Sequence, residues 1–387
     1  MNILYIHPLN VGALGGAEVF IVEISKRLKL RGHNVGVLHT RWSPYERVAK
    51  QNFIELMKYN VELYECDYFK FPRGLPVIKP SCLLRISKHY DLLYVSAHSP
   101  NELVVHTLNK VGNLNKPIVA VFHVMIEPHR YILHKLYLAP FIMACKSFDK
   151  LQVFNKYVYN FFVKYYRINK EKVELIPNGV DASFYRLIPK YFEQNNKFVV
   201  LYVSRFTSEK GVDIFHKVVS TFNERYSELR RAVIFKVAGA GPLKHYVEKL
   251  ANKYDNVVYL GYLGKEQLLA EYNSAHILIM TSRAENMPLT LLEASACGLP
   301  TVASAVPGVV DVVETLGYGI LVKPGNIEGY VKGILYFYNT WSKNPEKYYD
   351  MRVSIRERTV ANYDWNIIID RIENMFRQVL TDKEHKF

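Results

Sequence analysis

The sequence predicts an α/β protein built of two doubly wound, Rossmann-like domains, and three observations lead to this prediction. The chain has 387 residues, which is more than one hydrophobic core usually supports. Hydrophobic residues make up 49% and charged residues 22%, a balance that excludes a disordered chain and a collagen-like repeat. Short apolar runs alternate with longer amphipathic segments, which is typical of βα units around a parallel sheet.

The first half of the chain contains short apolar runs that we expect to form the strands of one parallel sheet. These runs are Ile3–His7, Val35–His39, Val61–Tyr64, Leu92–Ser96, Ile118–His123, Leu151–Asn155 and Val173–Ile176. Amphipathic segments separate them, and we expect the first domain to cover residues 1–185.

The second half repeats this design, so we expect a second doubly wound domain over residues 186–364. Its expected strands are Phe198–Ser204, Val233–Gly239, Val257–Leu260, Ile277–Thr281, Thr301–Ala303 and Ile320–Val322. The join is expected within Asp181–Lys197, where Pro189 precedes a polar stretch. We expect the last segment, 365–387, to form a helix that packs back on the first domain.

The charge of the chain is strongly positive and unevenly distributed. The net charge is +14, with 24 basic and 14 acidic residues through Asp181 and 26 and 22 after it. A basic first half attracts anions such as nucleic acid, anionic lipid headgroups or phosphorylated substrates. Solubility alone is the other explanation of the same charge.

The four cysteines (Cys66, Cys82, Cys145 and Cys297) are too few and too scattered to predict a disulfide framework. They form no CxxC pair, so we expect no zinc site and no bound metal. No stretch approaches the about 20 apolar residues that a membrane span needs, and the apolar start is too short for a signal peptide. We therefore expect a protein of the reducing cytoplasm.

The first strand-to-helix turn is rich in glycine. Gly12, Gly15 and Gly16 precede the amphipathic helix expected at Val19–Leu30. Glycines at such a turn let backbone N–H groups approach a phosphate at the helix N-terminus. The spacing does not match GxGxxG, so NAD binding has little support, and a tight turn that binds nothing is the alternative.

The second domain carries more specific signals at the carboxyl edge of its expected sheet. Arg205 and Lys210 follow the first strand, and Gly239 and Gly241 form a turn after the next one. Ligands bind at this edge in doubly wound folds, and an arginine with a lysine suits a diphosphate. Surface salt bridging is the alternative role of the two cations.

Two glutamates follow the strand Ile277–Thr281. We expect Glu285 in the loop after this strand and Glu293 in the helix that comes next. The two carboxylates can then bracket a ligand that lies across the helix N-terminus, and a carboxylate is a suitable acceptor for a pair of ribose hydroxyls.

These motifs, taken in order, resemble family 4 of the retaining glycosyltransferases, which have the GT-B fold of two Rossmann-like domains facing across a cleft. The matching strings are Ser204–Gly211, Gly239–Pro242 and Glu285–Pro300. Pro177–Asp181 and the Gly15–Gly16 loop match the same family. The resemblance covers nearly the whole chain.

The resemblance implies a role for each matching position. Arg205 and Lys210 would hold the donor diphosphate, Glu293 the ribose hydroxyls, and Glu285 would face the transferred sugar. The backbone of Asn286, Met287, Pro288 and Leu289 would contact the sugar and the phosphates. The glycine turns that adjoin the donor would be formed by Gly15, Gly16, Gly239 and Gly241. The family works without a metal or cofactor, and no Asp-x-Asp occurs here. Asn286 stands where many relatives have glycine, which leaves the donor sugar open.

Histidines at strand ends of the first domain are further candidates. His123 matches a family position that contacts the donor sugar, whereas His98 is an equal choice between a site residue and a packed one. We expect His7 and His129 to be packing residues. Glu127 is near His123 in sequence, but nothing marks it as the nucleophile that a double displacement needs. The resemblance implies a front-face attack, as is usual in the family.

The interpretation that follows is a retaining, metal-independent transfer of a hexose-type sugar from a UDP-, GDP- or ADP-sugar to a hydroxyl acceptor. The acceptor would be a glycan, a lipid or a lipid-linked saccharide. A nucleotide-sugar epimerase or a phosphorylase of the same fold is the alternative enzyme. A basic nucleic-acid-binding protein is the alternative from another class, and the chain has none of the motifs of that class.

One stretch of the first domain suggests a membrane surface. His129–Lys146 interleaves cations with aromatic and aliphatic residues, and Pro140 interrupts it. Phe53–Lys58 and Tyr157–Arg167 have a similar character. Such segments can lie in an anionic lipid interface at the cytoplasmic face. The alternative is a core helix whose apolar face packs on the sheet.

Overall fold

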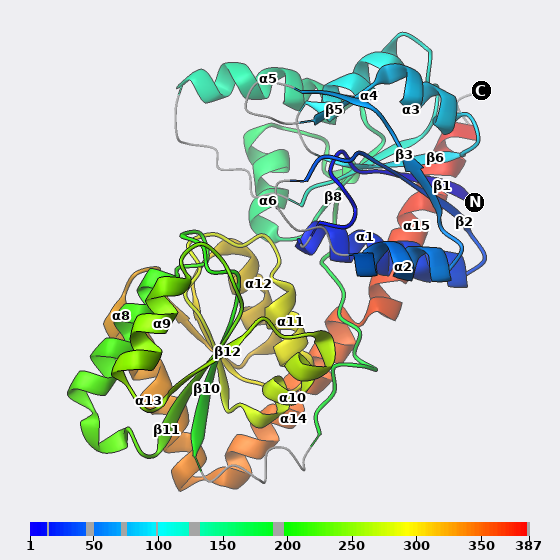
Figure 1. The fold of residues 1–387 in the computed structure, drawn as a ribbon. Coiled ribbons are helices and arrows are strands. Elements are labelled where there is room, and N and C mark those ends of the chain that lie inside the picture. The colour runs from blue at the N-terminus through cyan, green and yellow to red at the C-terminus, as the bar shows by residue number, and fades with distance from the viewer. Residues whose placement is uncertain are drawn as a thin grey trace. The chain divides into compact units, whose positions relative to one another are not determined.

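The computed structural model (Figure 1) describes residues 1–13, 15–43, 50–70, 76–97, 100–123, 132–188 and 197–384, without the side chains of 132–138 and 384. The chain divides into two compact units. Unit 1 comprises Met1–Pro177 with Ile368–Phe387, and unit 2 comprises Asn178–Ile367. The expected α/β fold with two parallel sheets is confirmed.

Unit 1 is built on a seven-stranded parallel sheet in the order β3-β2-β1-β6-β7-β8-β9. Its strands are β1 (Asn2–Ile6), β2 (Asn34–His39), β3 (Glu62–Glu65), β6 (Leu92–Ser96), β7 (Ile118–Val121), β8 (Lys150–Val153) and β9 (Val173–Leu175). Its α-helices are α1 (Gly16–Leu30), α2 (Lys50–Lys58), α3 (Pro80–Ser87), α4 (Asn101–Lys110), α5 (Ile132–Ser147) and α6 (Lys156–Asn160). A π-helix, η2 (Phe161–Tyr165), and a 3₁₀ turn, η3 (Lys170–Lys172), follow α6. The strand order reverses between β1 and β6, which makes this the switch point of the sheet.

Unit 2 is built on a six-stranded parallel sheet in the order β12-β11-β10-β13-β14-β15. Its strands are β10 (Phe198–Val203), β11 (Val233–Ala238), β12 (Val257–Gly261), β13 (Ile277–Met280), β14 (Thr301–Ser304) and β15 (Ile320–Val322). Its helices are α8 (Val212–Arg225), η4 (Ser227–Leu229), α9 (Lys244–Lys253), α10 (Lys265–Ser274), α11 (Leu289–Ala296), α12 (Pro307–Leu316), α13 (Ile327–Lys343) and α14 (Pro345–Tyr363). Here the order reverses between β10 and β13.

The division between the units falls earlier than the expected boundary at residue 185. Val180 bridges to Asp364, and the backbone N–H of Trp365 donates to Val180 O. A Cβ on Gly179 would clash with the indole of Trp365, so this glycine permits the close approach. The segment after Pro177 therefore belongs to unit 2.

The last helix, α15 (Trp365–Glu384), begins in unit 2 and contributes Ile368 onward to unit 1. Within unit 1 the Arg31 guanidinium contacts Asp370 and Glu373. The ring of Phe376 lies 5.0 Å from that of Tyr94 on β6. These contacts attach the end of the chain to the first sheet.

A fully buried arginine fixes the helix that carries Glu293. Arg352 on α14 donates to Ala275 O and to Cys297 O, both at 3.2 Å, and Arg356 donates to Ala296 O at 2.5 Å. The carbonyls at the end of α11 have no partner within the helix, so these guanidiniums satisfy them. The position of α11 is therefore set from its C-terminal end.

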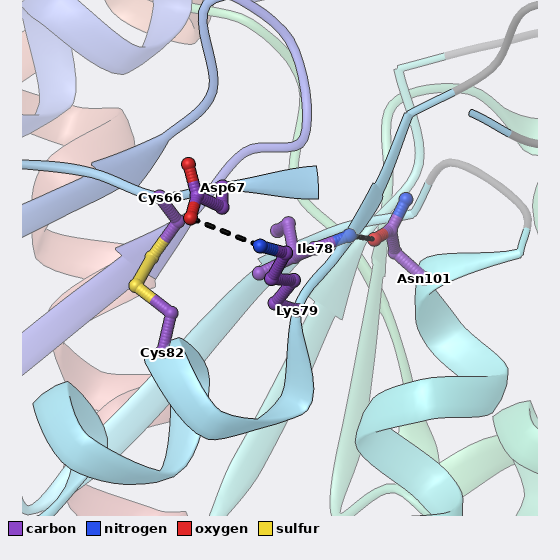
Figure 2. Close-up of a disulfide and its surroundings, with 6 residues drawn as sticks. All are labelled: Cys66, Asp67, Ile78, Lys79, Cys82 and Asn101. Carbon is purple, nitrogen blue, oxygen red and sulfur yellow. Dashed lines mark hydrogen bonds and ion pairs between the residues drawn. A yellow bond between two sulfur atoms is a disulfide. The ribbon is translucent and has the colours of Figure 1, made fainter. Parts of the chain in front are cut away.

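Two cysteines of unit 1 pair, although the four are too few and too scattered to predict a disulfide framework. Cys66 and Cys82 form a disulfide, with Cα atoms 6.0 Å apart at a sequence separation of 16 (Figure 2). A short antiparallel hairpin, β4 (Tyr68–Lys70) with β5 (Pro76–Ile78), brings them together, and the sequence did not predict it. Because disulfides persist mainly in oxidising compartments, the cysteines no longer support a reducing cytoplasm. Within the described part of the chain, no helix is long and apolar enough to cross a bilayer.

Candidate active site

The centre of the candidate site in unit 2 is an ion pair at the switch point of its sheet. Lys210 follows β10 and Glu285 follows β13, and the Lys210 ammonium lies 2.8 and 2.9 Å from the two carboxylate oxygens. Ser282 Oγ donates to Glu285 Oε1 at 2.7 Å. Glu285 is only 7% exposed, and a buried carboxylate is costly unless its charge is compensated. Here the Lys210 ammonium and the Ser282 hydroxyl compensate it.

A glycine lets the two loops of this ion pair approach each other. Gly211 precedes α8 with a φ of +67°, and a Cβ there would clash with the backbone oxygen of Thr281. Thr281 Oγ1 in turn donates to Gly211 O at 2.8 Å. Tyr202 OH donates to Lys210 O at 2.9 Å. The backbone around Lys210 is therefore fixed before any ligand binds.

The glycine turn after β11 packs on the loop after β10. Gly239 and Gly241 have φ values of +138° and +153°, and a Cβ on either would collide with the backbone of Ser204 or Phe206. Phe206 N–H donates to Ala240 O at 2.8 Å. Only glycine allows this contact, so the two loops expected to bind a diphosphate lie side by side.

Arg205 occupies the exposed start of the same loop. Its backbone oxygen accepts from Ser204 Oγ and from Thr207 N–H, both at 3.0 Å, while its side chain lies at the surface. The long exposed guanidinium can reach a ligand at the sheet edge, whereas Lys210 is held on Glu285.

Glu293 lies on α11 and is held by a tyrosine that the sequence did not predict. Tyr272 OH donates to Glu293 Oε2 at 3.0 Å. Burial, with the Glu293 charge next in effect, raises the pKa of Tyr272 well above its usual value, so the phenol stays a donor. This bond orients the carboxylate and leaves acceptor capacity for further donors.

The loop between the two glutamates is held from two sides. A Cβ on Gly308, at the start of α12, would clash with Asn286 O, and Gly308 N–H donates to Glu285 O at 3.3 Å. The buried Asn178 donates to Met287 O at 3.1 Å. Pro288 then precedes α11, whose first residue is Leu289. The backbone from Asn286 to Leu289 is thus fixed at a helix N-terminus, where N–H groups favour an anion.

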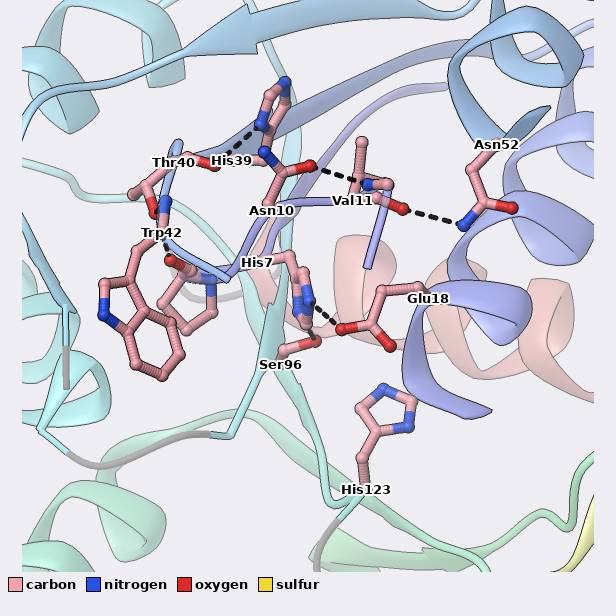
Figure 3. A network of polar contacts seen from close by, with 12 residues as sticks. His7, Asn10, Val11, Glu18, His39, Thr40, Trp42, Asn52, Ser96 and His123 are labelled. Carbon is pink, nitrogen blue, oxygen red and sulfur yellow. Dashed lines mark hydrogen bonds and ion pairs between the residues drawn. The ribbon is translucent and has the colours of Figure 1, made fainter. Parts of the chain in front are cut away.

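Unit 1 carries a chain of polar contacts at the carboxyl edge of its own sheet, and Figure 3 shows the contacts of His7 with Ser96 and Glu18 in this chain. His7 after β1 lies 3.1 Å from Ser96 Oγ through Nδ1 and 3.2 Å from Glu18 Oε1 through Nε2. Ser96 Oγ donates to Tyr5 OH at 3.1 Å, and Tyr5 OH lies 2.9 Å from His123 Nε2. His123 is therefore connected to the switch point of this sheet rather than standing alone.

The glycines of the first turn lie beside this chain of contacts. Gly15 precedes α1 and Gly16 is its first residue. The carboxylate of Glu18 lies against Gly15, at the position that a Cβ on this residue would occupy. Tyr5, Glu18 and Ser96 were not expected from the sequence, because single polar residues on separate strands form no motif.

The structure thus brings the predicted residues together in two sets. Unit 2 holds Arg205, Lys210, Glu285 and Glu293 with the glycine turn and the Asn286–Leu289 backbone, and unit 1 holds Gly15, Gly16 and His123. His7, which the sequence predicted to be a packing residue, is fully buried and contacts Ser96 and Glu18, so it belongs to the same chain of contacts. His98, Glu127 and His129 lie outside the described residues.

Family models match residues 14–358 of the chain in two consecutive parts. Residues 14–184 match the model described as Glycosyltransferase Family 4, and residues 185–358 match the model described as Glycosyl transferases group 1. The chain belongs to the family 4 glycosyltransferases with the GT-B fold.

Individual relatives agree with this assignment. The chain is 27% identical over 218 residues to one subunit of human phosphatidylinositol N-acetylglucosaminyltransferase, covering 55% of this chain and 42% of that protein. An uncharacterized glycosyltransferase of Methanocaldococcus jannaschii is 24% identical over 221 residues, covering 54% of each. The chain thus spans about half the length of these two relatives. The sulfoquinovosyl transferase SQD2 of Arabidopsis thaliana is 25% identical over 391 residues, covering 96% of this chain and 72% of that protein.

Solved structures share the fold. A glycosyltransferase from Rickettsia africae superimposes with a TM-score of 0.78 at 20% identity, covering 98% of both chains. HepE of Anabaena, crystallised with UDP, gives a TM-score of 0.77 at 19% identity, covering 98% of this chain and all of that one.

Proposed function

We propose that this family member transfers a hexose-type sugar from a nucleoside diphosphate donor to a hydroxyl acceptor, with retention of the anomeric configuration. The observation that carries the proposal is the Lys210–Glu285 ion pair at the switch point of unit 2, in a unit that also fixes Glu293 through Tyr272. Ligands of doubly wound sheets bind at this point.

The donor diphosphate is assigned to the loop after β10. Arg205 and Lys210 supply two cations there, and the negative charge of the leaving diphosphate grows as the sugar–phosphate bond breaks. The two cations are proposed to take the place of a metal ion. That HepE of Anabaena was crystallised with UDP and with UDP-glucose supports a donor of this class.

Glu293 is assigned to the ribose and Glu285 to the sugar. A carboxylate accepts from two vicinal hydroxyls, and the Tyr272 hydrogen bond fixes Glu293 for that task. Glu285 and the backbone from Asn286 to Leu289 are assigned to the hydroxyls of the transferred sugar and the adjoining phosphate. Asn286, at the start of this backbone segment, leaves the identity of the donor sugar open.

Unit 1 is assigned to the acceptor and to one side of the donor. The N–H of Gly16, at the start of α1, suits a phosphate oxygen. His123, held by Tyr5 through Nε2, is assigned to a hydroxyl of the donor sugar. The acceptor is proposed to be a glycan, a lipid or a lipid-linked saccharide, in keeping with relatives named for phosphatidylinositol and sulfoquinovosyl transfer.

The proposed transfer proceeds on one face of the sugar. The bond from the anomeric carbon to the diphosphate oxygen breaks, and that oxygen takes the proton of the acceptor hydroxyl. The acceptor oxygen then forms its bond to the anomeric carbon from the same side, which retains the configuration. Lys210 and Arg205 stabilise the departing charge, and no cofactor enters the reaction.

The experiment that tests the proposal is a thermal unfolding screen with UDP-, GDP- and ADP-sugars, followed by product analysis. One donor class should raise the unfolding midpoint. With glycan and lipid acceptors, NMR should show a product with the donor's anomeric configuration, formed equally well in the presence of EDTA. An isomerised donor formed without any acceptor would instead identify an epimerase.

A further inference from the structure

A cavity of about 520 Å³ opens between α5 and the π-helix η2 of unit 1, away from the carboxyl edge of the sheet. Its size is that of a site for a small molecule or a lipid chain. Its lining is apolar and aromatic apart from one lysine, and consists of Ala139, Ile142, Met143, Lys146, Tyr165 and Tyr166.

Helix α5 has one face in the core and one face outside. Phe141, Ala144 and Cys145 are buried, as expected of a core helix. Met143 is 52% exposed, and Lys146 one turn later is exposed as well. The described part of α5 therefore presents an apolar side chain and a cation to solvent side by side.

The other wall of the cavity is locally strained. A π-helix is rare and concentrates at functional sites. Here its last residue is Tyr165, and the ring of the next residue, Tyr166, lies 4.9 Å from that of Tyr165 between centroids. Tyr165 is 44% exposed. Arg167, directly after them, has a φ of +51°, a conformation that non-glycine residues rarely adopt. Both tyrosines line the cavity.

The charge around the cavity is strongly positive. Residues 139–172 contain seven Lys or Arg and two acidic residues. No residue in the described part of the chain forms an ion pair with Lys146, Lys164, Arg167 or Lys170, whereas Lys150 is paired with Glu174. Unpaired cations beside an exposed apolar surface favour an anionic, amphipathic partner.

We propose that this surface, formed by Met143, Lys146, Tyr165, Tyr166 and the adjoining cations, docks on an anionic lipid bilayer. The apolar cavity takes lipid chain segments between Met143 and the tyrosine rings, and the cations face the lipid phosphates. The inference does not rest on the proposed function, since membrane docking requires neither the donor nor the transfer reaction.

The charge argues against two other occupants. A symmetric dimer through this surface would place two strongly basic patches against each other, which is unfavourable. An uncharged protein helix would bury the apolar cavity but leave the four cations without partners. Anionic lipid satisfies both the apolar and the charged part of the surface.

The test is flotation of the full chain with vesicles of phosphatidylcholine alone or with added phosphatidylglycerol. The wild type should float with the anionic vesicles, weakly with neutral ones, and lose binding at high salt. Lys146→Gln with Lys164→Gln should weaken the partition about fivefold for each lysine removed. Met143→Ser with Tyr165→Ser should also weaken the partition, because it removes apolar contacts with the lipid chains.

Matched controls lie in unit 2, where Tyr336 is 56% exposed and Lys332 is exposed. Tyr336→Ser with Lys332→Gln should leave flotation unchanged, and unfolding midpoints should show that every variant folds. The proposal would be overturned if the wild type did not float, or if the α5–η2 variants floated as well as the wild type. It would also be overturned if the wild type self-associated and these variants abolished that self-association.

Discussion

The two units place polar residues at the same edge of similar sheets, yet they assemble them differently. In unit 2 the site consists of continuous strings that each follow a strand, such as Ser204–Gly211 and Glu285–Glu293. In unit 1 it consists of single residues from separate elements, such as His7, Ser96 and His123. Strings of this kind are recognisable in a sequence, whereas isolated residues are grouped only by the fold.

The chemistry of the two edges differs as well. Unit 2 presents an ion pair, Lys210–Glu285, with a second cation on Arg205, which suits a ligand whose charge changes during reaction. Unit 1 presents hydrogen bonds between His7, Ser96, Tyr5 and His123, where burial raises the pKa of Tyr5 and keeps the phenol neutral. We infer that unit 2 handles charge and unit 1 positions hydroxyl groups.

The largest effect is expected from Lys210→Ala. It leaves the buried Glu285 without its cation and removes one of the two cations proposed to stabilise the leaving diphosphate, so turnover should fall about 10²–10³-fold while donor affinity falls less. Steady-state kinetics with a saturating donor measures this.

Lys236→Ala is the matched control, because Lys236 is paired with Glu271 away from the sheet edge and its loss should leave turnover near wild type. A Lys210→Ala enzyme with wild-type turnover would refute the role of unit 2 in charge stabilisation.

We expect the disulfide to stabilise unit 1 and to leave the stability of unit 2 unchanged. Replacing Cys66 and Cys82 by serine should lower the free energy of unfolding of unit 1 by about 3 kcal/mol, because a loop of this length gains chain entropy when opened. Hydrogen exchange in unit 2 and nucleotide affinity should stay unchanged. A reductant should destabilise unit 1 of the wild type to the same extent and should not change the stability of the double variant. Equal destabilisation of both units would contradict the prediction that the disulfide stabilises unit 1 alone.

Glu293→Gln should weaken nucleoside diphosphate binding by about 1–3 kcal/mol, because a buried hydroxyl pair loses a charged acceptor. Titration calorimetry measures this directly. Tyr272→Phe should have a smaller effect of about 1 kcal/mol, since it removes only the group that orients the carboxylate. If free nucleoside diphosphate binds both variants as it binds the wild type, the ribose assignment is wrong.

The strands of both units were predictable from the sequence, whereas many contacts within the site were not. All thirteen expected strands are present, because each is a short apolar run between turn residues. The hairpin of Tyr68–Lys70 and Pro76–Ile78 was missed, since three-residue strands carry no periodicity. The partners of the site, Ser282, Tyr272 and Gly308, were missed as well, because their roles depend on contacts across the fold.

The one effect that depends on pH concerns a buried carboxyl of unit 1. Glu102 on α4 is fully buried, and burial raises its pKa to about 8 from 4.5. The folded chain thus keeps the proton that the unfolded chain releases. The stability that this site contributes is fully present below pH 4.5 and is lost as the pH rises toward 8.

Glu102→Gln is neutral at every pH, so its stability relative to the wild type should rise by about 1 kcal/mol for each pH unit between 4.5 and 8. The cost of burying the amide is the same at every pH and shifts the whole difference by a constant. Unfolding midpoints measured across this range give the difference. A constant difference between the two proteins would contradict the raised pKa.

The central claim is that the carboxyl edge of unit 2 binds a nucleoside diphosphate. Hydrogen exchange of the intact chain, with and without millimolar UDP, GDP or ADP, tests it most directly. We expect one of these nucleotides to slow exchange in peptides that cover residues 205–211, 239–242 and 285–293, and Glu293→Gln to weaken that protection. Slowed exchange confined to unit 1, or none with any of the three nucleotides, would contradict the claim.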